Sequence, residues 1–309
     1  MSISLPKVSI CIPTYNYGQF IADTIESVLA QSYVDYELIV VDNCSSDNTR
    51  DIVSAYMAKD RRIRYYCNES NIGMVGNWNR CLQYTRGDYV KILCADDLLD
   101  PTCIERSMEF FDRYPNASLV TCIRQIVDEQ LKPMADVAYA DSTNIESGRS
   151  VIRRCFFEGN LIGEPTAVMF RRKDAGRGFD SRYKQLIDLE MWFHLLEKGD
   201  FAFIAEALCS FRQHEEQGTK SSIKEFTVID DELLLRETYL NKSYIGDSLM
   251  NVIRWKFHLA QIIWNHRKYG IESAMVKKKL AQHYPLLLFY IALYFVKAKQ
   301  RILRIINAS

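Results

Sequence analysis

Two adjacent aspartates, Asp96 and Asp97, close an apolar run that begins at Asp88 and is typical of a buried strand. Carboxylates belong where such a strand reaches solvent, because each needs water or a positive partner. A pair of them suits a hard divalent cation, since Mg²⁺ takes one or two carboxylates and fills its shell with phosphate and water oxygens. A plain strand-to-helix turn explains them as well, because Asp100 and Pro101 follow and such a pair commonly begins a helix. The pair alone leaves both interpretations open.

Polar side chains also follow the three strands predicted before this one. Pro13-Thr-Tyr-Asn16 ends the first, Asp42-Asn-Cys-Ser-Ser-Asp47 ends the second, and Asn71 and Asn77 come after the third. Their hydroxyl, amide and backbone groups could receive a base, a ribose or a phosphate. Each fragment taken singly could equally be a connection with a helix cap, as Asp47 could be. Four consecutive polar strand ends indicate a ligand site, because an ordinary sheet needs no such repetition.

The elements that must position these residues alternate between strands and helices. Val8–Pro13 and Glu37–Asp42 are short, β-branched and apolar, as parallel strands covered on both faces are. Ile21, Ile25 and Val28 recur at helical spacing between them. In chain order we predict strands at 8–13, 37–42, 63–67 and 88–96, and helices at 21–29, 47–59 and 74–84. This alternation predicts a doubly wound α/β sheet with ligands outside the carboxyl ends of its strands.

The remainder of the chain is less regular. We expect strands at 118–127 and 166–171, one or two more within 201–211, and a polar surface loop at 136–148. After about residue 220 the pattern becomes helical, with long segments near 225–239 and 248–269. A soft boundary is therefore expected near residue 220.

Composition narrows the class of protein. Lys+Arg and Asp+Glu balance at 39 each in 309 residues, so the charge does not favour nucleic acid as a partner. Nine cysteines without CxxC spacing favour a reducing compartment and no zinc site. The N-terminus has no signal-peptide pattern and no apolar stretch reaches the roughly 18 residues of a membrane span, so we expect a cytoplasmic protein. The absence of GxxxxGK[ST] and of GxGxxG after the first strand argues against P-loop and NAD enzymes.

Together the motifs resemble a family 2 glycosyltransferase of the GT-A fold, over about the first two thirds of the chain. The matching pieces are 8–16, 37–42 with 45–47, 71–77 and Ala95-Asp-Asp97. The resemblance implies an inverting, nucleotide-sugar-dependent enzyme in which Asp96 and Asp97 hold Mg²⁺ or Mn²⁺ on the donor diphosphate. It implies donor-binding roles for residues at the strand ends, namely Pro13, Thr14, Tyr15, Asn16, Asp42, Asn71, Asn77 and Asp96. The family's D-x-D motif places its first aspartate where this chain has Cys94.

Three later segments extend the resemblance. Ile187-Asp-Leu-Glu-Met-Trp192 resembles the family's catalytic acidic motif, in which Asp188 takes the position of the base. Leu189, Trp192 and Phe193 fall on one helical face, so Asp188 stands at the beginning of a helix and could instead be only a cap. The resemblance also implies acceptor-side residues, namely Glu164, Pro165, Thr166, Glu190 and Trp192. In the segment that resembles R-x-H, it implies that Arg212 approaches the diphosphate and His214 the metal, although His214 could simply be exposed on a loop.

The resemblance implies three regions and a function. They are a nucleotide-sugar-binding half at 1–97, an acceptor-binding half at 98–219 and a helical C-terminal region at 220–309. The function implied is sugar transfer to an acceptor hydroxyl in cell-surface polysaccharide or glycolipid assembly, with a glycan or a lipid-linked molecule as acceptor. A sugar-nucleotide pyrophosphorylase and an inactive nucleotide-sugar-binding scaffold stay open, and so does an oligomeric state.

The C-terminal segment predicts a location. Residues 286–296 are apolar throughout, and at eleven residues they are too short to span a bilayer. Lys277-Lys-Lys279 precede them, and Lys297, Lys299, Arg301 and Arg304 follow. Basic residues flanking a short apolar helix suit shallow insertion at an anionic surface. We therefore expect residues 270–309 to hold the protein on the cytosolic face of a membrane, with docking on the core or on a second subunit as the alternative.

Overall fold

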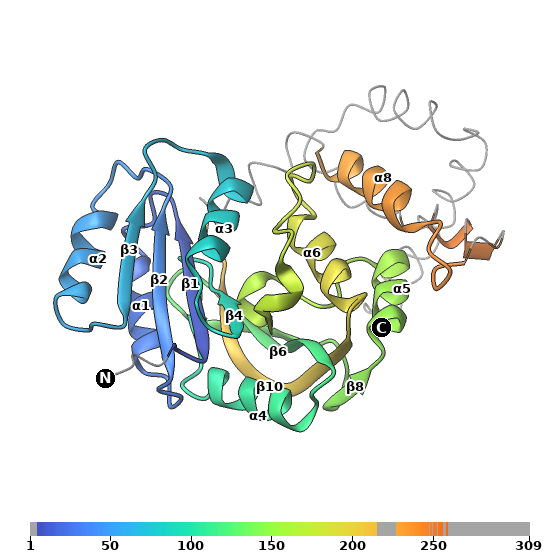
Figure 1. The fold of residues 1–309 in the computed structure, drawn as a ribbon, viewed down its shortest axis with the longest axis horizontal. Helices are drawn as coiled ribbons and strands as arrows, with labels where there is room; N and C mark the ends of the chain where they lie inside the picture. Colours follow the sequence, from blue (N-terminus) through green and yellow to red (C-terminus); the bar gives the residue numbers. More distant parts are fainter. Residues whose placement is uncertain are drawn as a thin grey trace, which may run out of the picture. The chain divides into compact units, whose positions relative to one another are not determined.

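The computed structural model describes residues 5–214, 227–246, 248, 250–251, 253–255 and 258 (Figure 1). The chain divides into two compact units. The first comprises residues 1–152, 160–183 and 187–215, and the second comprises residues 153–159, 184–186 and 216–309. The three regions expected from the sequence, with boundaries at 97 and 219, stay predictions.

Strands and helices alternate through the first half of the chain, as predicted. In chain order the elements are β1 (Val8–Thr14), α1 (Ile21–Leu29), β2 (Tyr36–Asp42), α2 (Thr49–Met57), β3 (Ile63–Cys67), α3 (Gly73–Tyr84), β4 (Tyr89–Ile92), β5 (Leu98–Leu99), α4 (Cys103–Arg113), β6 (Ala117–Val127), β7 (Pro133–Val137), β8 (Asn144–Glu146), α5 (Gly148–Glu158), the 3₁₀ turn η1 (Pro165–Ala167), β9 (Met169–Arg171), the 3₁₀ turn η2 (Arg172–Ala175), α6 (Ile187–Leu196), β10 (Asp200–Arg212) and α8 (Thr227–Tyr239).

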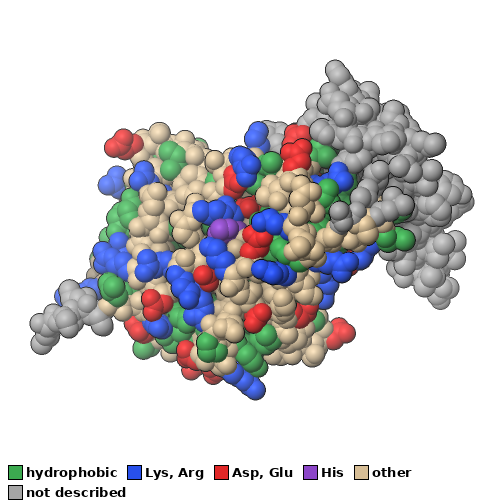
Figure 2. Space-filling view, turned by 45° about the vertical axis from the view of Figure 1, so that its right-hand side comes forward, with side chains coloured by type: hydrophobic (Ala, Val, Ile, Leu, Met, Phe, Trp, Pro, Cys, Tyr) green, Lys and Arg blue, Asp and Glu red, His purple; other side chains and the backbone are tan. Residues whose placement is uncertain are grey.

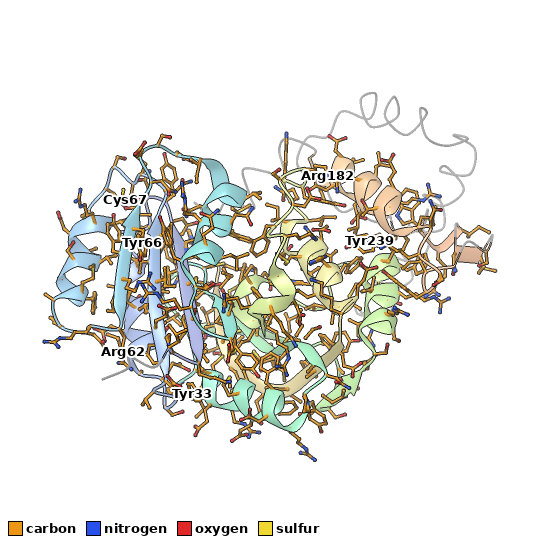
Figure 3. All side chains as sticks on the ribbon, viewed as in Figure 1. Tyr33, Arg62, Tyr66, Cys67, Arg182 and Tyr239 are labelled. Atoms are coloured by element: carbon orange, nitrogen blue, oxygen red, sulfur yellow. The ribbon has the colours of Figure 1, made fainter. Side chains whose placement is uncertain are left out.

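A single sheet runs through the first unit in the order β3-β2-β1-β4-β9-β6-β10-β5, with β7 beside β6 and β8 beside β10. β3, β2, β1 and β4 pair in parallel, as do β6 and β10, and β9 lies antiparallel between the two groups. The mixed α/β sheet, mostly parallel along this path, confirms the predicted fold class. β3 forms one edge, and Arg62, Tyr66 and Cys67 lie along it (Figure 3).

The register of the parallel strands brings their carboxyl ends to one edge of the sheet. Thr14 of β1 lies beside Asp42 of β2, and Asp42 lies beside Cys67 of β3. Alternate residues of β1, including Ile10 and Ile12, pack into a core with α1 and α4 and are fully buried. The other face of β1 is also covered, since Ser9 and Cys11 are fully buried, so both faces of the strand are packed.

Two sequence expectations need correction. The fourth strand ends at Ile92 rather than at Asp96: the Leu93 amide makes a last hydrogen bond to the Cys11 carbonyl at 2.8 Å, and the chain then turns at Cys94–Asp97. The predicted loop at 136–148 contains the end of β7 and all of β8. β7 is mostly exposed, so burial imposes no apolar alternation on its sequence, and the backbone of β6 holds it in place.

The helix predicted near 225–239 is present as α8, whereas the segment 248–269 lies largely outside the described residues. None of the helices in the described part of the chain has both the length and the apolar character that a membrane span needs. On the face drawn in Figure 2, acidic and basic side chains interleave over the described surface, as the balanced composition predicts.

Candidate active site

Asp96 and Asp97 lie in a tight turn that follows β4. The amide N–H of Asp97 donates to the carbonyl of Cys94 at 3.2 Å, which closes the turn. Both side chains are buried, with Asp96 7% and Asp97 0% exposed. The turn therefore directs two carboxylates into the protein, and each must find partners there.

Asp97 finds its partners within the fold. Its Oδ2 accepts from the Thr166 hydroxyl at 2.5 Å, and its Oδ1 accepts from the Arg212 amide at 2.9 Å. Burial, together with the charges of Asp96 and Glu164, raises the pKa of the Asp97 carboxyl well above its usual range. Asp97 thus ties the β4 turn to η1 and to the end of β10.

Asp96 faces the end of β10. Its Oδ2 lies 2.9 Å from Nε2 of His214, whose ring packs 4.5 Å from the ring of Phe20. Arg212 lies beside them, with its guanidinium 4.9 Å from the Phe20 ring and Nη2 2.9 Å from Oδ2 of Asp23. The segment 212–214 is therefore anchored at the acidic turn, and His214 is buried rather than exposed on a loop.

The donor set at this turn fits a divalent cation. Ligand atoms of Cys94, Asp96 and Asp97 lie within 4.8 Å of one another. Burial and the charges of Asp97 and Asp96 raise the pKa of the Cys94 thiol well above its usual value. Sulfur is a soft ligand, whereas Mg²⁺ and Mn²⁺ prefer oxygen and imidazole donors. The carboxylate of Asp96 and the imidazole of His214 are consequently the donors best suited to a metal here.

The carboxyl ends of β1 and β2 form a second polar group. Thr14 Oγ1 is buried without a hydrogen-bond partner among the described residues. Asn16 has a positive φ of 57°, and its side-chain Oδ1 accepts from the Ser46 amide at 2.8 Å. Asp42 accepts from the Ser45 amide at 2.8 Å and from the Tyr65 hydroxyl at 2.6 Å. These contacts hold the two loops in one conformation around an unsatisfied hydroxyl.

The other predicted residues at this edge have different environments. Asn77 is buried, and its amide accepts from Asn68 at 2.9 Å and donates to the Val41 carbonyl at 3.0 Å. Asn71 accepts from Asn43 at 2.7 Å. Pro13 is partly buried, and Tyr15 is 44% exposed. Asn71 and Asn77 therefore join the ends of β2 and β3 through an amide network.

Asp188 begins α6, as predicted, and its surroundings alter its acidity. Its Oδ1 accepts from the Leu189 amide at 2.7 Å, and Asn160 Nδ2 donates to its Oδ2 at 3.2 Å. Burial raises the pKa of Asp188 to about 7, although the Leu189 amide and the charge of Arg124 oppose the rise. A carboxyl group with a pKa near 7 can both hold and release a proton at neutral pH, which is the property of a general base.

Glu164 links Asp188 with the acidic turn. Its negative charge contributes to the raised pKa of both Asp188 and Asp97, after the larger effect of burial, so it lies near both groups. Its Oε2 pairs with Nη1 of Arg124 at 3.0 Å. Gly163 leaves room for this arginine, because a Cβ there would lie 2.1 Å from Arg124 Nη1, and its φ of +117° also favours glycine. Glu164 thus acts on the pKa of both acidic groups.

The remaining predicted acceptor-side residues surround this region. Trp192 is fully buried, and its Nε1 donates to the Gly163 carbonyl at 3.0 Å. Glu190 is buried and receives two hydrogen bonds from Arg177, at 2.6 and 2.7 Å. Pro165 and Thr166 are buried in η1. Their environments suit positioning of the segment 160–166, and the acceptor contacts expected of them stay predictions.

Sequence reasoning missed Asn160, Arg124 and Tyr65. Asn160 donates to Asp188, the charge of Arg124 lowers the pKa of Asp188, and Tyr65 donates to Asp42. The partners are distant in the chain, so local sequence patterns do not indicate these contacts. Asn160 lies three residues before Gly163, and the amide of Gly163 donates to its Oδ1 at 3.0 Å. In the sequence, only its position close to the predicted segment at Glu164 indicated a role for Asn160.

Known structures resemble this chain over nearly its whole length. Staphylococcus aureus TarS in complex with UDP-GlcNAc aligns over 96% of this chain and 91% of its own, with a TM-score of 0.62 and 17% identity. The mannosyltransferase PcManGT from Pyrobaculum calidifontis, in complex with GDP-Man and Mn²⁺, aligns over 97% of this chain and 81% of its own, with a TM-score of 0.58 and 15% identity. These similarities confirm the GT-A fold.

Sequence relatives agree with the fold. The putative teichuronic acid biosynthesis glycosyltransferase TuaG of Bacillus subtilis is 31% identical over 214 residues, which cover 67% of this chain and 79% of TuaG. The family model described as Glycosyl transferase family 2 matches residues 9–179, more than half of the chain. The chain therefore belongs to glycosyltransferase family 2.

Proposed function

We propose that this glycosyltransferase inverts the anomeric centre of a nucleotide-diphosphate sugar as it transfers the sugar to an acceptor hydroxyl, with Asp188 as the base. The observation that carries the proposal is the Asp188 carboxyl, whose pKa is raised to about 7 beside an acidic turn that fits a divalent cation. Glu164 bears on both groups, which supports a single reaction centre.

Asp188 acts on the acceptor. Its carboxylate takes the proton of the attacking hydroxyl, and the oxygen displaces the diphosphate from the opposite face of the sugar. General-base catalysis of this kind contributes roughly 10²–10⁴-fold in rate. Asn160 orients Oδ2 of Asp188 through its amide, and the Leu189 amide orients Oδ1. Fixed geometry of this kind supplies much of the remaining acceleration.

The donor lies across the carboxyl ends of β1, β2 and β4. Thr14, Asn16 and Asp42 contact the nucleoside, and Arg212 approaches the diphosphate. Asp96 and His214 would hold Mg²⁺ or Mn²⁺. Asp97 would hold the turn after β4 in place through its hydrogen bonds to Thr166 and Arg212. Such an ion supplies Lewis-acid stabilisation of the charge on the leaving diphosphate. Support comes from the unsatisfied Thr14 hydroxyl and from the contact of Asp96 with His214.

Cell-surface polysaccharide or glycolipid assembly is the setting that we propose, with a glycan or lipid-linked acceptor. The relative TuaG is described as a putative teichuronic acid biosynthesis glycosyltransferase, which supports this class of product. We also propose that the enzyme is cytoplasmic and works beside the cytosolic face of a membrane. The basic and apolar segment 270–309 lies outside the described residues, so this part of the proposal rests on sequence alone.

The full chain should be incubated with a panel of nucleotide sugars and Mn²⁺. Release of a nucleoside diphosphate, with opposite anomeric configuration in donor and product by NMR, is the expected result. Retained configuration would contradict the inverting mechanism. Exchange of pyrophosphate into a nucleoside triphosphate would point to a pyrophosphorylase. Donor binding without turnover of any donor–acceptor pair would point to a scaffold. Thermal shift can preselect the donor, because a ligand at 100 times its Kd stabilises the fold by about 2.7 kcal/mol.

A further inference from the structure

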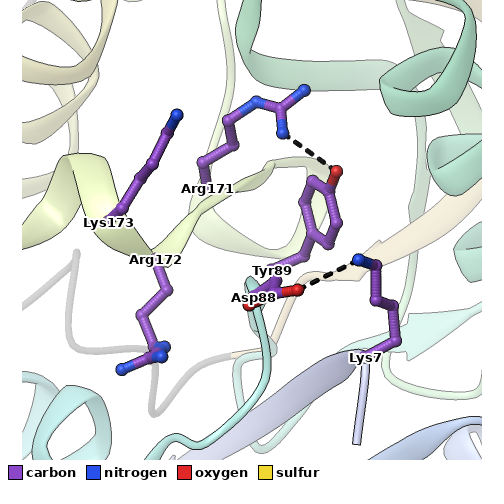
Figure 4. A pocket seen from close by; sticks show the side chains of 6 residues that line it. All are labelled: Lys7, Asp88, Tyr89, Arg171, Arg172 and Lys173. Carbon is purple, nitrogen blue, oxygen red and sulfur yellow. Dashed lines mark hydrogen bonds and ion pairs between the residues drawn. The ribbon is translucent and has the colours of Figure 1, made fainter. Parts of the chain in front are cut away.

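A hollow of about 190 Å³ lies away from the candidate active site and is lined by Lys7, Asp88, Tyr89, Arg171, Arg172 and Lys173 (Figure 4). These residues precede β1, begin β4 and follow β9. Thr14 and Asp96 instead follow the carboxyl ends of β1 and β4. The length of β1, roughly 20 Å at about 3.3 Å per residue, separates the two ends. A donor bound at the active site therefore does not reach this hollow.

The charge of the hollow is unbalanced. Four of its six lining residues are basic and one is acidic, so their formal charges sum to +3. The acidic residue, Asp88, pairs with Lys7 at 3.0 Å, but both side chains are largely solvent-exposed, at 66% and 41%. Ion pairs with that exposure are weak, so Asp88 neutralises little of the surrounding positive charge.

The guanidinium groups are held in place by neutral partners. Arg171 donates to the Tyr89 hydroxyl at 2.9 Å and to the Ala117 carbonyl at 2.7 Å. Arg172 donates from Nε to the Gly87 carbonyl at 2.6 Å, and its backbone N–H donates to the Asp88 carbonyl at 2.9 Å. The contact of Arg172 fixes its side chain through Nε and leaves its terminal nitrogens available for another acceptor.

Lys173 adds a second positive charge whose ammonium group is not paired with another described residue. It is exposed, and its Nζ has no hydrogen bond or ion pair to another described residue. It follows Arg172 directly in η2, and both residues line the hollow, with side chains that extend in opposite directions from this short segment (Figure 4). Figure 4 shows the side chains of Arg172 and Lys173 without a dashed contact to any other residue drawn.

We propose that this hollow binds a phosphoryl group. The volume is below the roughly 300–1,000 Å³ of a drug-sized ligand site, which favours a small anion. A phosphate dianion would offset most of the +3 charge, and its oxygens suit the planar fork of an arginine. The phosphoryl group could belong to a soluble phosphorylated compound or to the headgroup of an anionic phospholipid.

The test compares two double variants of the full chain that remove equal charge. R172Q/K173Q changes the hollow, whereas K59Q/R61Q removes one lysine and one arginine that are exposed elsewhere on the surface. Isothermal titration with inorganic phosphate at low salt should show affinity about tenfold or more weaker for R172Q/K173Q, since hydrogen bonds to charged groups carry about 1.5–3 kcal/mol. K59Q/R61Q should match the wild type within twofold. Any phosphate bound at the donor site is common to all three proteins, so a difference in phosphate affinity between them measures binding in the hollow.

Equal affinity of R172Q/K173Q and the wild type would overturn the proposal, and so would an equal loss in K59Q/R61Q. K173Q alone guards against misfolding, because it leaves the contacts of Arg172 intact, and it should weaken binding by several-fold. Flotation with phosphatidic acid vesicles, against phosphatidylcholine alone, then identifies the source of the phosphoryl group. Residues 270–309 are common to all variants, so the comparison is of vesicle affinity between the two double variants. Weaker binding of R172Q/K173Q than of K59Q/R61Q assigns a lipid headgroup, and equal vesicle binding of the two with weakened phosphate binding in R172Q/K173Q assigns a soluble compound.

Discussion

Burial raises the pKa of Asp188, and the hydrogen bonds and charges around the carboxyl group modify that rise. Leu189 donates to it from the first turn of α6, Asn160 approaches from the segment before η1, and Arg124 and Glu164 place opposite charges nearby. A helix cap exposed to water would keep an ordinary carboxyl pKa, because hydration stabilises the charged form. The raised pKa supports the proposal that Asp188 acts as a base.

The pH dependence follows from that pKa. A general base must be deprotonated, so kcat/KM should rise as the pH increases through about 7 and level off above it. The folded-state pKa lies above the unfolded value of about 3.9, so this group also makes stability fall as the pH rises between the two values. Rate and thermal-melting profiles from pH 5 to pH 9 check both expectations. A rate that is flat across pH 6–8 would speak against Asp188 as the base.

Asp188→Asn keeps the size and capping ability of the side chain but cannot take a proton at neutral pH. We expect turnover to drop by at least about a hundredfold, with donor affinity close to that of the wild type. Single-turnover kinetics and titration calorimetry measure the two quantities. Full activity of this variant, combined with a lower melting temperature of Asp188→Ala, would show that the residue is structural.

Asp96 and Asp97 lie side by side but differ in their partners. Asp97 accepts from Thr166 and from the Arg212 amide, whereas Asp96 faces His214. Asp96→Ala should therefore abolish Mn²⁺-dependent donor binding while the fold survives. Asp97→Ala should also reduce melting temperature, because it leaves buried donors unpaired, typically at about 1–3 kcal/mol each. Differential scanning calorimetry measures the melting temperatures of the Asp96→Ala and Asp97→Ala variants, and donor titration with and without Mn²⁺ measures their metal-dependent donor binding. Undiminished Mn²⁺ stimulation in Asp96→Ala would exclude it as the main ligand.

Among the elements, the approach of β4 to β1 is the tightest contact that positions the site. Gly87 lies just before β4, and a Cβ at this position would meet the backbone of Ser9 and Val8 at 2.7 Å. The Gly87 amide donates to the Ser9 hydroxyl at 2.9 Å. Backbone atoms cannot yield as a flexible side chain can, so only glycine suits this crossing.

Gly87→Ala should consequently destabilise the fold by about 1–3 kcal/mol, the usual cost of overpacking. Gly176→Ala serves as the matched control, because the nearest atom to its Cβ would be the Lys173 carbonyl at 3.9 Å and its φ is −56°. That variant should be neutral or more stable by up to about 1 kcal/mol. Urea denaturation of both proteins measures the free energies of unfolding. Equal stability of the two variants would refute the close approach of β4 to β1.

At the scale of the whole molecule, all the candidate active-site residues belong to the first unit. Residues 270–309, which belong to the second unit by chain position, carry the proposed membrane contact. Replacement of Lys277, Lys278 and Lys279 by glutamine removes charge without truncating the chain. We expect weaker binding to anionic vesicles, by about 1 kcal/mol per lysine at low salt, with unchanged nucleotide binding.

Deletion of 270–309 should release the protein from such vesicles entirely. Sedimentation with phosphatidylglycerol vesicles measures both variants, and donor titration confirms an intact nucleotide site. A full chain that does not bind these vesicles at low salt would contradict membrane contact. Global unfolding on deletion would assign the segment to the core.

The sequence by itself determined the order of the elements in the first half of the chain, the polar strand ends and the family. Apolar patterns are local, so strands at 8–13, 37–42 and 63–67 could be predicted without knowledge of their neighbours, and each agrees with the observed strand to within one residue at either end. The carboxyl ends of parallel strands necessarily meet at one edge, which predicted that Thr14 and Asp42 come together.

Tertiary structure alone decided what surrounds each acidic group. Asp97 accepts hydrogen bonds from η1 and β10, and Asp188 accepts one from Asn160. The sheet order places β9, β6 and β10 one after another on the same side of β4. The basic hollow likewise gathers Lys7 and Arg172 from opposite ends of the first unit's sequence. Such contacts depend on long-range strand pairing and on burial, which have no local period in the sequence. The pKa of Asp188 is decided in the same way, since desolvation is a property of the packed fold.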